Sequence, residues 1–279
     1  MRRKLAIFRS LHRAAEVVRC ARETKQWFPI TLAYLGFKDL AYPCSLQLRD
    51  LRPIYLKEVS DVWAFWQIFL RRVYPLEGSE ELIVDAGANI GFFTLLAARQ
   101  APRAKLISVE PFPESYERLM ENVRNNQLGD RVRCLNYALG GDSERRMMRL
   151  GGKRSQARRV IAFHPKKDQD TAPVPTTTVP TTTLEQVFEE QSITSVDLLK
   201  MDIEGSEYEV LFSTPARVLR RIRHICLEYH PDVPDYTPAQ MFRYLQQVGF
   251  TVIRDMRNSK GFGIALLALN REQAGDLAA

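Results

Sequence analysis

The sequence has no long run of apolar residues, and it contains few cysteines. No apolar run in the 279-residue sequence approaches the roughly 18 consecutive apolar residues that a membrane-spanning helix requires. Only residues 5–8 are apolar after the basic start, which is too short for the roughly 7–15-residue apolar stretch of a signal peptide. The cysteines (Cys20, Cys44, Cys134 and Cys226) lie far apart without a CxxC pair, so neither a zinc site nor a disulfide framework is predicted. A soluble, cytoplasmic protein is therefore expected.

The overall composition is that of an ordinary globular protein. Apolar residues make up 45% of the chain and charged residues 26%, values that argue against disordered and fibrous classes. The length allows one large domain or two small ones, with a sizeable core in either case.

The net charge of +7 is concentrated in two segments. Residues 1–30 contain eight basic and two acidic residues, and residues 143–167 contain nine basic and one acidic residue. Such localised charge attracts anionic partners, including a phosphorylated substrate, nucleic acid or an acidic membrane surface, but solvated surfaces that aid solubility are an equal alternative. Charge alone does not decide the function.

Before residue 79 the pattern is helical. Apolar residues at three-to-four spacing predict an amphipathic basic helix over residues 4–22, which would lie on an anionic membrane or cover the edge of the following domain. A second helix is predicted over residues 59–74, ending at Tyr74-Pro75. We therefore expect residues 1–78 to form a helical N-terminal extension, followed by one main domain over 79–270 and a tail over 271–279.

Within the main domain, short apolar runs alternate with helical stretches, which predicts a mostly parallel sheet with helices on both faces. The predicted strands are Leu82–Ala86, Leu106–Val109, Val132–Asn136, Val196–Met201, Ile222–Tyr229, Thr251–Arg254 and Ile264–Leu269. The predicted helices are Phe92–Arg99, Glu114–Asn126, Glu207–Phe212 and Pro238–Val248. The last two strands are too close in sequence for a parallel crossover, so the last strand is expected to be antiparallel. Residues 140–183 interrupt the alternation as an insertion or substrate loop, with an extra hairpin around Arg158–Phe163 as one option.

The segment Asp-Ala-Gly-Ala-Asn-Ile-Gly at residues 85–91 carries the clearest chemical signal. It follows an apolar strand and opens a helix, so Gly87 allows a tight turn near a ligand and Gly91 allows close packing of the helix. About twenty residues later a second strand ends at Glu110, where a carboxylate can accept hydrogen bonds from both hydroxyls of a ribose. The pairing predicts a cofactor that carries a nucleoside.

The glycine spacing favours S-adenosylmethionine over NAD. Dinucleotide sites use G-x-G-x-x-G, whereas here three residues separate Gly87 from Gly91. The carboxylate of Asp85 at the strand end suits a ligand with an ammonium group and disfavours a pyrophosphate.

Several motifs together resemble the FkbM family of S-adenosylmethionine-dependent O-methyltransferases. They are the 85–91 turn, Val109-Glu110-Pro111, the stretch from Asp197 to Glu207 with its K-x-D-x-E-G-x-E pattern, Leu48-Arg49-Asp50, and Glu228-Tyr229-His230. The resemblance covers roughly residues 48–255. It implies a Rossmann-like class I methyltransferase fold with a seven-stranded sheet, and methyl transfer to a hydroxyl of a sugar, polyketide or similar small molecule. The residues expected to hold the cofactor are Asp85, Gly87, Asn89, Gly91, Glu110, Pro111 and Asp202.

Two strand ends supply the predicted catalytic groups. Lys200, Asp202 and Glu204 alternate with apolar residues, so all three are expected on one side, with Lys200 and Glu204 near the substrate. An alcohol must lose its proton during methyl transfer, and a positioned base typically adds ~10²–10⁴-fold. His230 is expected either to take that role or to cap a loop at the strand end, and Glu228 is the competing base or the group that orients His230. Asp202 is expected to hold the cofactor or the acceptor hydroxyl. No metal ion is expected.

Other functions stay open at this point. RNA or protein methylation would use the basic segments as substrate guides, although no RNA-binding module is recognisable and no stable nucleic-acid partner is expected. A non-catalytic binder of anionic partners that retains the fold is the second alternative. The basic segment 143–167 raises the hypothesis of an anionic or glycosylated acceptor, and residues 1–30 that of peripheral membrane contact.

Overall fold

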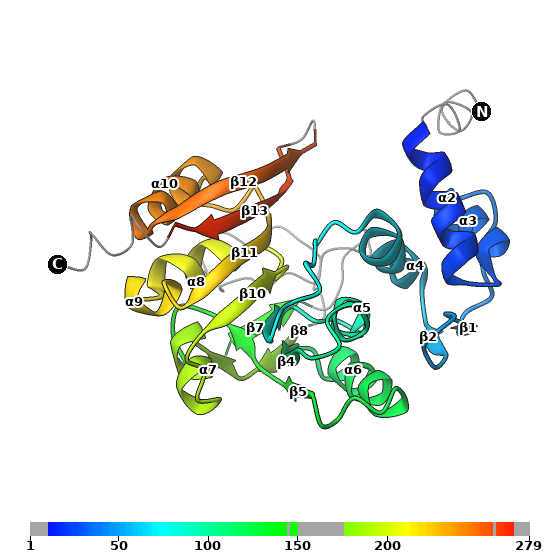
Figure 1. The fold of residues 1–279 in the computed structure, drawn as a ribbon, viewed down its shortest axis with the longest axis horizontal. Coiled ribbons are helices and arrows are strands. Elements are labelled where there is room, and N and C mark those ends of the chain that lie inside the picture. The colour runs from blue at the N-terminus through cyan, green and yellow to red at the C-terminus, as the bar shows by residue number, and fades with distance from the viewer. Residues whose placement is uncertain (1–10, 144–145, 150–175, 259–260, 271–279) are drawn as a thin grey trace.

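The computed structural model describes residues 11–143, 146–149, 176–258 and 261–270, and a seven-stranded sheet forms its centre (Figure 1). The strands are β3 (Leu82–Ala86), β4 (Lys105–Val109), β5 (Val132–Leu135), β10 (Val196–Met201), β11 (Ile222–Tyr229), β12 (Phe250–Arg257) and β13 (Gly263–Leu269). Their order is β12-β13-β11-β10-β3-β4-β5, and β13 runs antiparallel to both of its neighbours while the pairs from β11 to β5 are parallel. This arrangement confirms the predicted Rossmann-like class I methyltransferase fold.

Successive strand residues face two separate cores, one on each side of the sheet. Ile83 and Leu198 pack with one core, whereas their neighbours Val84 and Leu199 pack with the other. The first core is covered by α5 (Phe92–Gln100) and α6 (Pro113–Asn125), and the second by α7 (Leu184–Glu190), α8 (Glu207–Ser213), α9 (Ala216–Leu219) and α10 (Pro238–Val248). Among the helices of the described ranges, none combines the length and apolar character needed to span a bilayer.

The N-terminal extension is not purely helical. It contains α2 (Leu11–Glu23), α3 (Trp27–Tyr34), the antiparallel strands β1 (Cys44–Leu46) and β2 (Ile54–Leu56), α4 (Val59–Phe65) and a π-helix, η2 (Trp66–Arg71). The sequence pattern misses α3 and the β1–β2 pair. These elements share a hydrophobic core with Phe92, Leu95 and Leu96 of α5, so the extension packs directly on the helix that follows the glycine turn.

The helix predicted over residues 59–74 is too long. It ends at Arg71, because Arg72 adopts a left-handed conformation with φ of 53° that breaks the helical path. Tyr74 therefore leaves the helix, and its ring is buried against Phe93 of α5 with the ring centroids 5.6 Å apart. The helix predicted over 4–22 corresponds to α2, and its first residues, 4–10, lie outside the described residues.

The loop predicted over residues 140–183 is partly wrong, because both ends of this segment form strands. β7 (Arg146–Arg149) pairs antiparallel with β8 (Thr176–Val179), and β9 (Thr181–Thr182) pairs parallel with β6 (Ala138–Leu139). The predicted hairpin around Arg158–Phe163, most of the basic segment 143–167 and the tail 271–279 lie outside the described residues.

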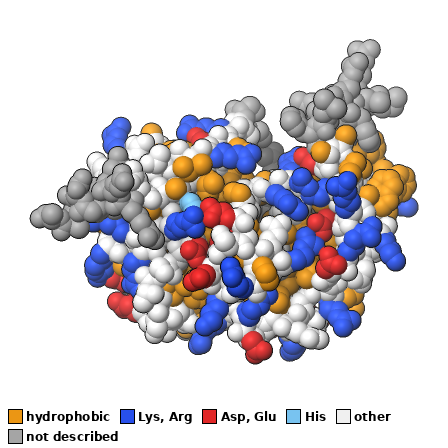
Figure 2. Space-filling model, viewed as in Figure 1, with side chains coloured by type: hydrophobic (Ala, Val, Ile, Leu, Met, Phe, Trp, Pro, Cys, Tyr) orange, Lys and Arg blue, Asp and Glu red, His pale blue; other side chains and the backbone are white. Residues whose placement is uncertain are grey.

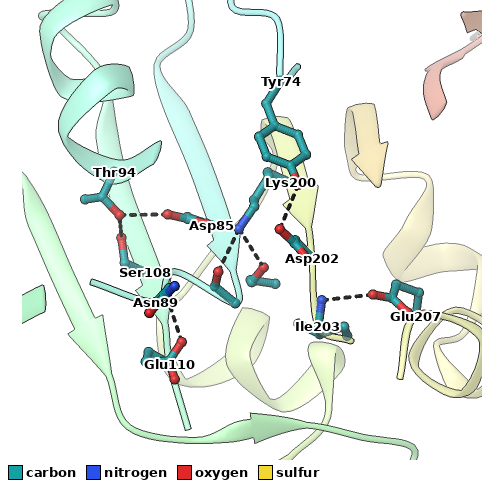
Figure 3. Close-up of polar contacts among 12 residues, drawn as sticks. Tyr74, Asp85, Asn89, Thr94, Ser108, Glu110, Lys200, Asp202, Ile203 and Glu207 are labelled. Atoms are coloured by element: carbon teal, nitrogen blue, oxygen red, sulfur yellow. Dashed lines mark hydrogen bonds and ion pairs between the residues drawn. The ribbon is translucent and has the colours of Figure 1, made fainter. Parts of the chain in front are cut away.

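A buried ion pair joins the two strands at the middle of the sheet (Figure 3). Lys200 of β10 lies opposite Asp85 of β3, and its Nζ is 2.9 Å from Asp85 Oδ1. The same ammonium donates to the carbonyl oxygen of Gly87 at 2.7 Å and lies 3.3 Å from that of Ala86. The other Asp85 oxygen accepts a 2.7 Å hydrogen bond from the Thr94 hydroxyl. The pair thus fixes the end of β3 and the turn that follows it.

We predict that Lys200→Met destabilises the fold by about 3–5 kcal/mol, the usual cost of breaking a buried ion pair by removing one partner. The change leaves the Asp85 carboxylate buried without its cation and the Gly87 carbonyl without its donor. Denaturant unfolding measures the difference in unfolding free energy. Lys105→Met, at an exposed lysine on the neighbouring strand β4, is the matched control and should stay close to the wild type. Equal stability of the two variants would contradict the importance of this pair.

Candidate active site

A cavity of about 580 Å³ lies at the carboxyl ends of the parallel strands. Open α/β sheets bind ligands at this edge, and the volume is typical of a small-molecule site. One wall comes from the glycine turn and the end of β4, a second from the ends of β10 and β11, and a third from α4 and η2 of the N-terminal extension. The β12–β13 hairpin adds Asn258 and Phe262.

The glycine turn between β3 and α5 is held at very close range to β10. Gly87 has φ of 77°, and a Cβ at this position would lie 1.9 Å from the carbonyl oxygen of Asp202. Only glycine fits there. Gly91, with φ of 92°, caps α5, and a Cβ would lie 2.7 Å from Leu119 of α6. Gly87 lines the cavity, whereas Gly91 serves the packing of the two helices and lies outside the lining.

Glu110 lies at the end of β4 and borders the cavity with only 4% of its surface exposed. One carboxylate oxygen accepts a 2.7 Å hydrogen bond from the backbone N–H of Asn89, and the other accepts one of 3.0 Å from the N–H of Phe112. The Asn136 side chain donates to the carbonyl oxygens of Glu110 and Pro111. The carboxylate is therefore held in one orientation beside the glycine turn, and Asn89 and Pro111 also line the cavity.

Asp85 lies elsewhere than the sequence predicts. Its side chain is fully buried beneath the turn, its two oxygens are bonded to Lys200 and Thr94, and it does not line the cavity. The expected contact with a cofactor ammonium group is thus replaced by a contact with a lysine of the protein itself. Lys200, expected near the substrate, is 2% exposed and directs its ammonium to Asp85 and the turn carbonyls.

Asp202 follows β10 and faces the cavity, where its carboxylate accepts a 2.7 Å hydrogen bond from the hydroxyl of Tyr74 (Figure 3). Burial, then the charges of Asp202 and Glu228, raise the pKa of Tyr74 well above its ordinary value, so the phenol stays neutral and remains a donor. Tyr74 therefore links the N-terminal extension to the candidate catalytic group.

Acidic side chains surround His230 at the end of β11. Its Nε2 is 3.6 Å from a Glu204 oxygen and its Nδ1 is 3.8 Å from a Glu207 oxygen, separations that indicate charge attraction more than hydrogen bonding. Burial lowers the pKa of His230, but the attraction of Glu207, Glu204 and Glu228 outweighs it and raises the pKa overall. The shift favours the cationic form of the imidazole near neutrality.

The pKa of Glu228 is also raised, which for a carboxyl favours the uncharged form. Burial, followed by the nearby charge of Asp202, raises the pKa of its carboxyl well above the ordinary range, and the His230 charge offsets only part of this rise. A carboxyl whose pKa is raised toward neutrality is well matched to proton transfer.

Glu207, which the sequence places at a helix start, holds the preceding turn. Its oxygens accept hydrogen bonds from the backbone N–H groups of Ile203 and Gly205 at 2.9 and 2.8 Å. Glu204 within this turn has φ of 57°, a left-handed conformation that directs the chain from β10 back to α8.

In the part of the chain that the structure describes, no group of three or more His, Cys, Asp or Glu side chains has a geometry that fits a metal ion.

The structure brings Glu110, Lys200, Asp202, Glu204, Glu228 and His230 around one cavity. Sequence reasoning misses Tyr74, Trp63 and Gln67, which reach the cavity from the N-terminal extension. In the sequence, Tyr74 indicates only the predicted end of a helix. No local pattern shows that it meets a carboxylate 128 residues later in the chain.

Comparison with known proteins identifies the family of this chain. A model described as the methyltransferase FkbM domain matches residues 85–252. The chain is 28% identical over 219 residues to the 31-O-demethyl-FK506 methyltransferase FkbM of Streptomyces tacrolimicus, covering 68% of this chain and 81% of that one. It is 26% identical over 228 residues to methyltransferase sdnD of Sordaria araneosa, covering 72% and 86% respectively. The solved structure of methyltransferase FkbM from Methylobacillus flagellatus aligns with a TM-score of 0.45 and 13% identity, over 75% of this chain and 54% of that one. Because the family model spans more than half of the sequence, the chain belongs to the FkbM methyltransferase family.

Proposed function

We propose that the protein transfers a methyl group from S-adenosylmethionine to a hydroxyl of a small molecule or sugar. The observation that carries the proposal is the cavity in which Glu110 stands on one side and Asp202 and Glu228 stand on the other. Membership of a methyltransferase family supports the reaction class. The name of the Streptomyces tacrolimicus relative, a 31-O-demethyl-FK506 methyltransferase, refers to methylation on an oxygen and supports the choice of a hydroxyl.

The residues around the cavity fit this cofactor. The Glu110 carboxylate can accept hydrogen bonds from the two hydroxyls of a ribose. The cavity lining also contains the acidic side chains of Asp202 and Glu204 after β10, which suit a ligand that carries a positive charge. When bound, the cofactor would supply a methyl group on a positively charged sulfur. Transfer would form a bond from the acceptor oxygen to this carbon, break the carbon–sulfur bond to leave a neutral thioether, and require a base to take the hydroxyl proton.

We assign Glu228 as the base that removes the proton of the acceptor hydroxyl. Its pKa is raised to about 8, closer to neutrality than that of His230, which is raised to about 9 and leaves the imidazole more fully protonated. His230 instead supplies positive charge among Glu204, Glu207 and Glu228. Asp202, oriented by Tyr74, is left to hold the acceptor hydroxyl or the cofactor in line.

The cofactor assignment predicts that Glu110→Gln weakens binding of S-adenosylmethionine about tenfold or more, because hydrogen bonds to a charged group are lost. Titration calorimetry measures the affinity, with NAD as a control ligand that should give no signal. Glu189→Gln, at an exposed glutamate on α7, is the control variant and should bind like the wild type. Absence of binding to the wild type would overturn the cofactor proposal. Unchanged binding to Glu110→Gln would remove only the role of Glu110.

The base assignment predicts a rate that rises with pH. Only ionised Glu228 can accept a proton, and its raised pKa moves the midpoint of the rise well above the ordinary glutamate value of about 4.3. Once mass spectrometry has identified a hydroxylated acceptor that gains a methyl group, kcat is measured against pH. Glu228→Gln should lower kcat by ~10²–10⁴-fold and abolish this rise while cofactor affinity stays unchanged.

The corresponding His230→Gln variant separates the two candidate bases. If Glu228 is the base, the rise in kcat with pH persists in His230→Gln, with its midpoint shifted upward because a nearby positive charge is lost. Loss of the rise in His230→Gln together with its persistence in Glu228→Gln would assign the base to the histidine instead.

A further inference from the structure

The exposed hydrophobic side chains are unevenly distributed. Nine large ones are exposed among the described residues, and seven of them lie between residues 18 and 63 of the N-terminal extension. These seven include all five exposed aromatic residues of the described ranges. The aromatic residues are Trp27, Phe28, Phe37, Tyr55 and Trp63, with exposures from 38% to 57%. Exposed hydrophobic side chains that gather in one patch mark interaction sites, whereas singly scattered ones are ordinary.

The same part of the extension has a positive surface because its acidic residues point inward. Glu23 pairs with Arg99 at 2.8 Å, Asp61 with Arg118 at 2.7 Å, and Glu16 with Arg71 at 3.1 Å. Between residues 14 and 63 the exposed charged residues are then six basic and two acidic. The basic residues are Arg22, Lys25, Lys38, Arg49, Arg52 and Lys57, and the acidic ones are Asp39 and Asp50.

Aromatic and basic side chains lie together on this surface. Trp27 and Phe28 begin α3, with Trp27 two residues after Lys25, and their rings meet edge to face with centroids 5.5 Å apart. Tyr34, at the other end of α3, lies 4.8 Å from the exposed ring of Trp63. Figure 2 shows hydrophobic and basic side chains side by side in the region where Figure 1 places α2 and α3. We call the exposed side chains of residues 18–59 the extension surface, because Trp63 beyond them lines the cavity.

We propose that the extension surface docks on an anionic lipid bilayer. Tryptophan and other aromatic rings favour the boundary between headgroups and acyl chains, and lysine and arginine attract anionic headgroups, so the two residue classes act together at a membrane. The positive charge argues against a second copy of this chain as the partner, because a symmetric contact would bring like charges together. The exposed aliphatic residues Val18 and Val59 suit lipid better than the charged backbone of a nucleic acid. The proposal does not depend on the proposed function.

The test is co-sedimentation of the full chain with vesicles of phosphatidylcholine alone or mixed with phosphatidylglycerol. We expect binding to the anionic vesicles only, and weaker binding as salt increases. Trp27→Ser combined with Phe28→Ser should reduce that binding about tenfold or more, because two interfacial aromatic rings are lost. Ile253→Ser, at a side chain 60% exposed on β12, is the matched control and should bind like the wild type.

Thermal unfolding verifies that the variants are folded. If the double serine variant does not fold, Arg22→Glu combined with Lys25→Glu provides the second test, and it too should lose binding to anionic vesicles. Equal binding to neutral and anionic vesicles, or unchanged binding by the folded variants, would overturn the proposal. So would a dimer that the variants disrupt, or binding to a single-stranded RNA oligonucleotide in the absence of vesicle binding.

Discussion

The contact between Lys200 and Asp85 is the interaction on which the candidate active site depends most. Burial lowers the pKa of the lysine, but Asp85, Asp202 and Glu110 reverse this effect and raise the pKa, so the ammonium stays charged beneath the cavity. From there it binds the carbonyl of Gly87 and holds the turn at the end of β3. This turn approaches the backbone of Asp202 so closely that a side chain at residue 87 has no room. One buried cation thus connects the central strands, the glycine turn and the acidic edge of β10.

The acidic residues of this region differ in role because they differ in environment. Asp85 is fully enclosed and bonded, so it maintains structure. Glu207 is equally buried, and its oxygens accept two backbone N–H groups, which shapes the turn before α8. Glu228 faces the cavity beside Asp202, where burial and like charge favour its neutral form. The same functional group therefore serves as scaffold in one position and as candidate base in another.

The sequence was sufficient to predict the sheet, because apolar strands such as 82–86 and 196–201 and the glycine turn leave strong local patterns. It was not sufficient to predict which groups pair across the fold. Asp85 is expected to contact a cofactor because it lies at a strand end, yet its partner is a lysine 115 residues away. Likewise, the aromatic stripe predicts a helix to residue 74, whereas Arg72 ends it early and frees Tyr74 to reach Asp202. Such outcomes depend on tertiary packing, which local periodicity does not encode.

The N-terminal extension shows how one set of contacts has two consequences. Glu23 and Asp61 attach the extension to the main domain through Arg99 of α5 and Arg118 of α6, and Asp61 and Arg118 also border the cavity. Because these carboxylates are used for attachment, they are removed from the surface, and the charged groups left exposed between residues 14 and 63 are mainly basic. The Asp61–Arg118 pair therefore borders the cavity and, together with the Glu23–Arg99 pair, leaves the exposed charge of residues 14–63 mainly basic. A change at the Asp61–Arg118 pair is expected to affect the cavity and the surface charge together, since both depend on the Asp61 carboxylate.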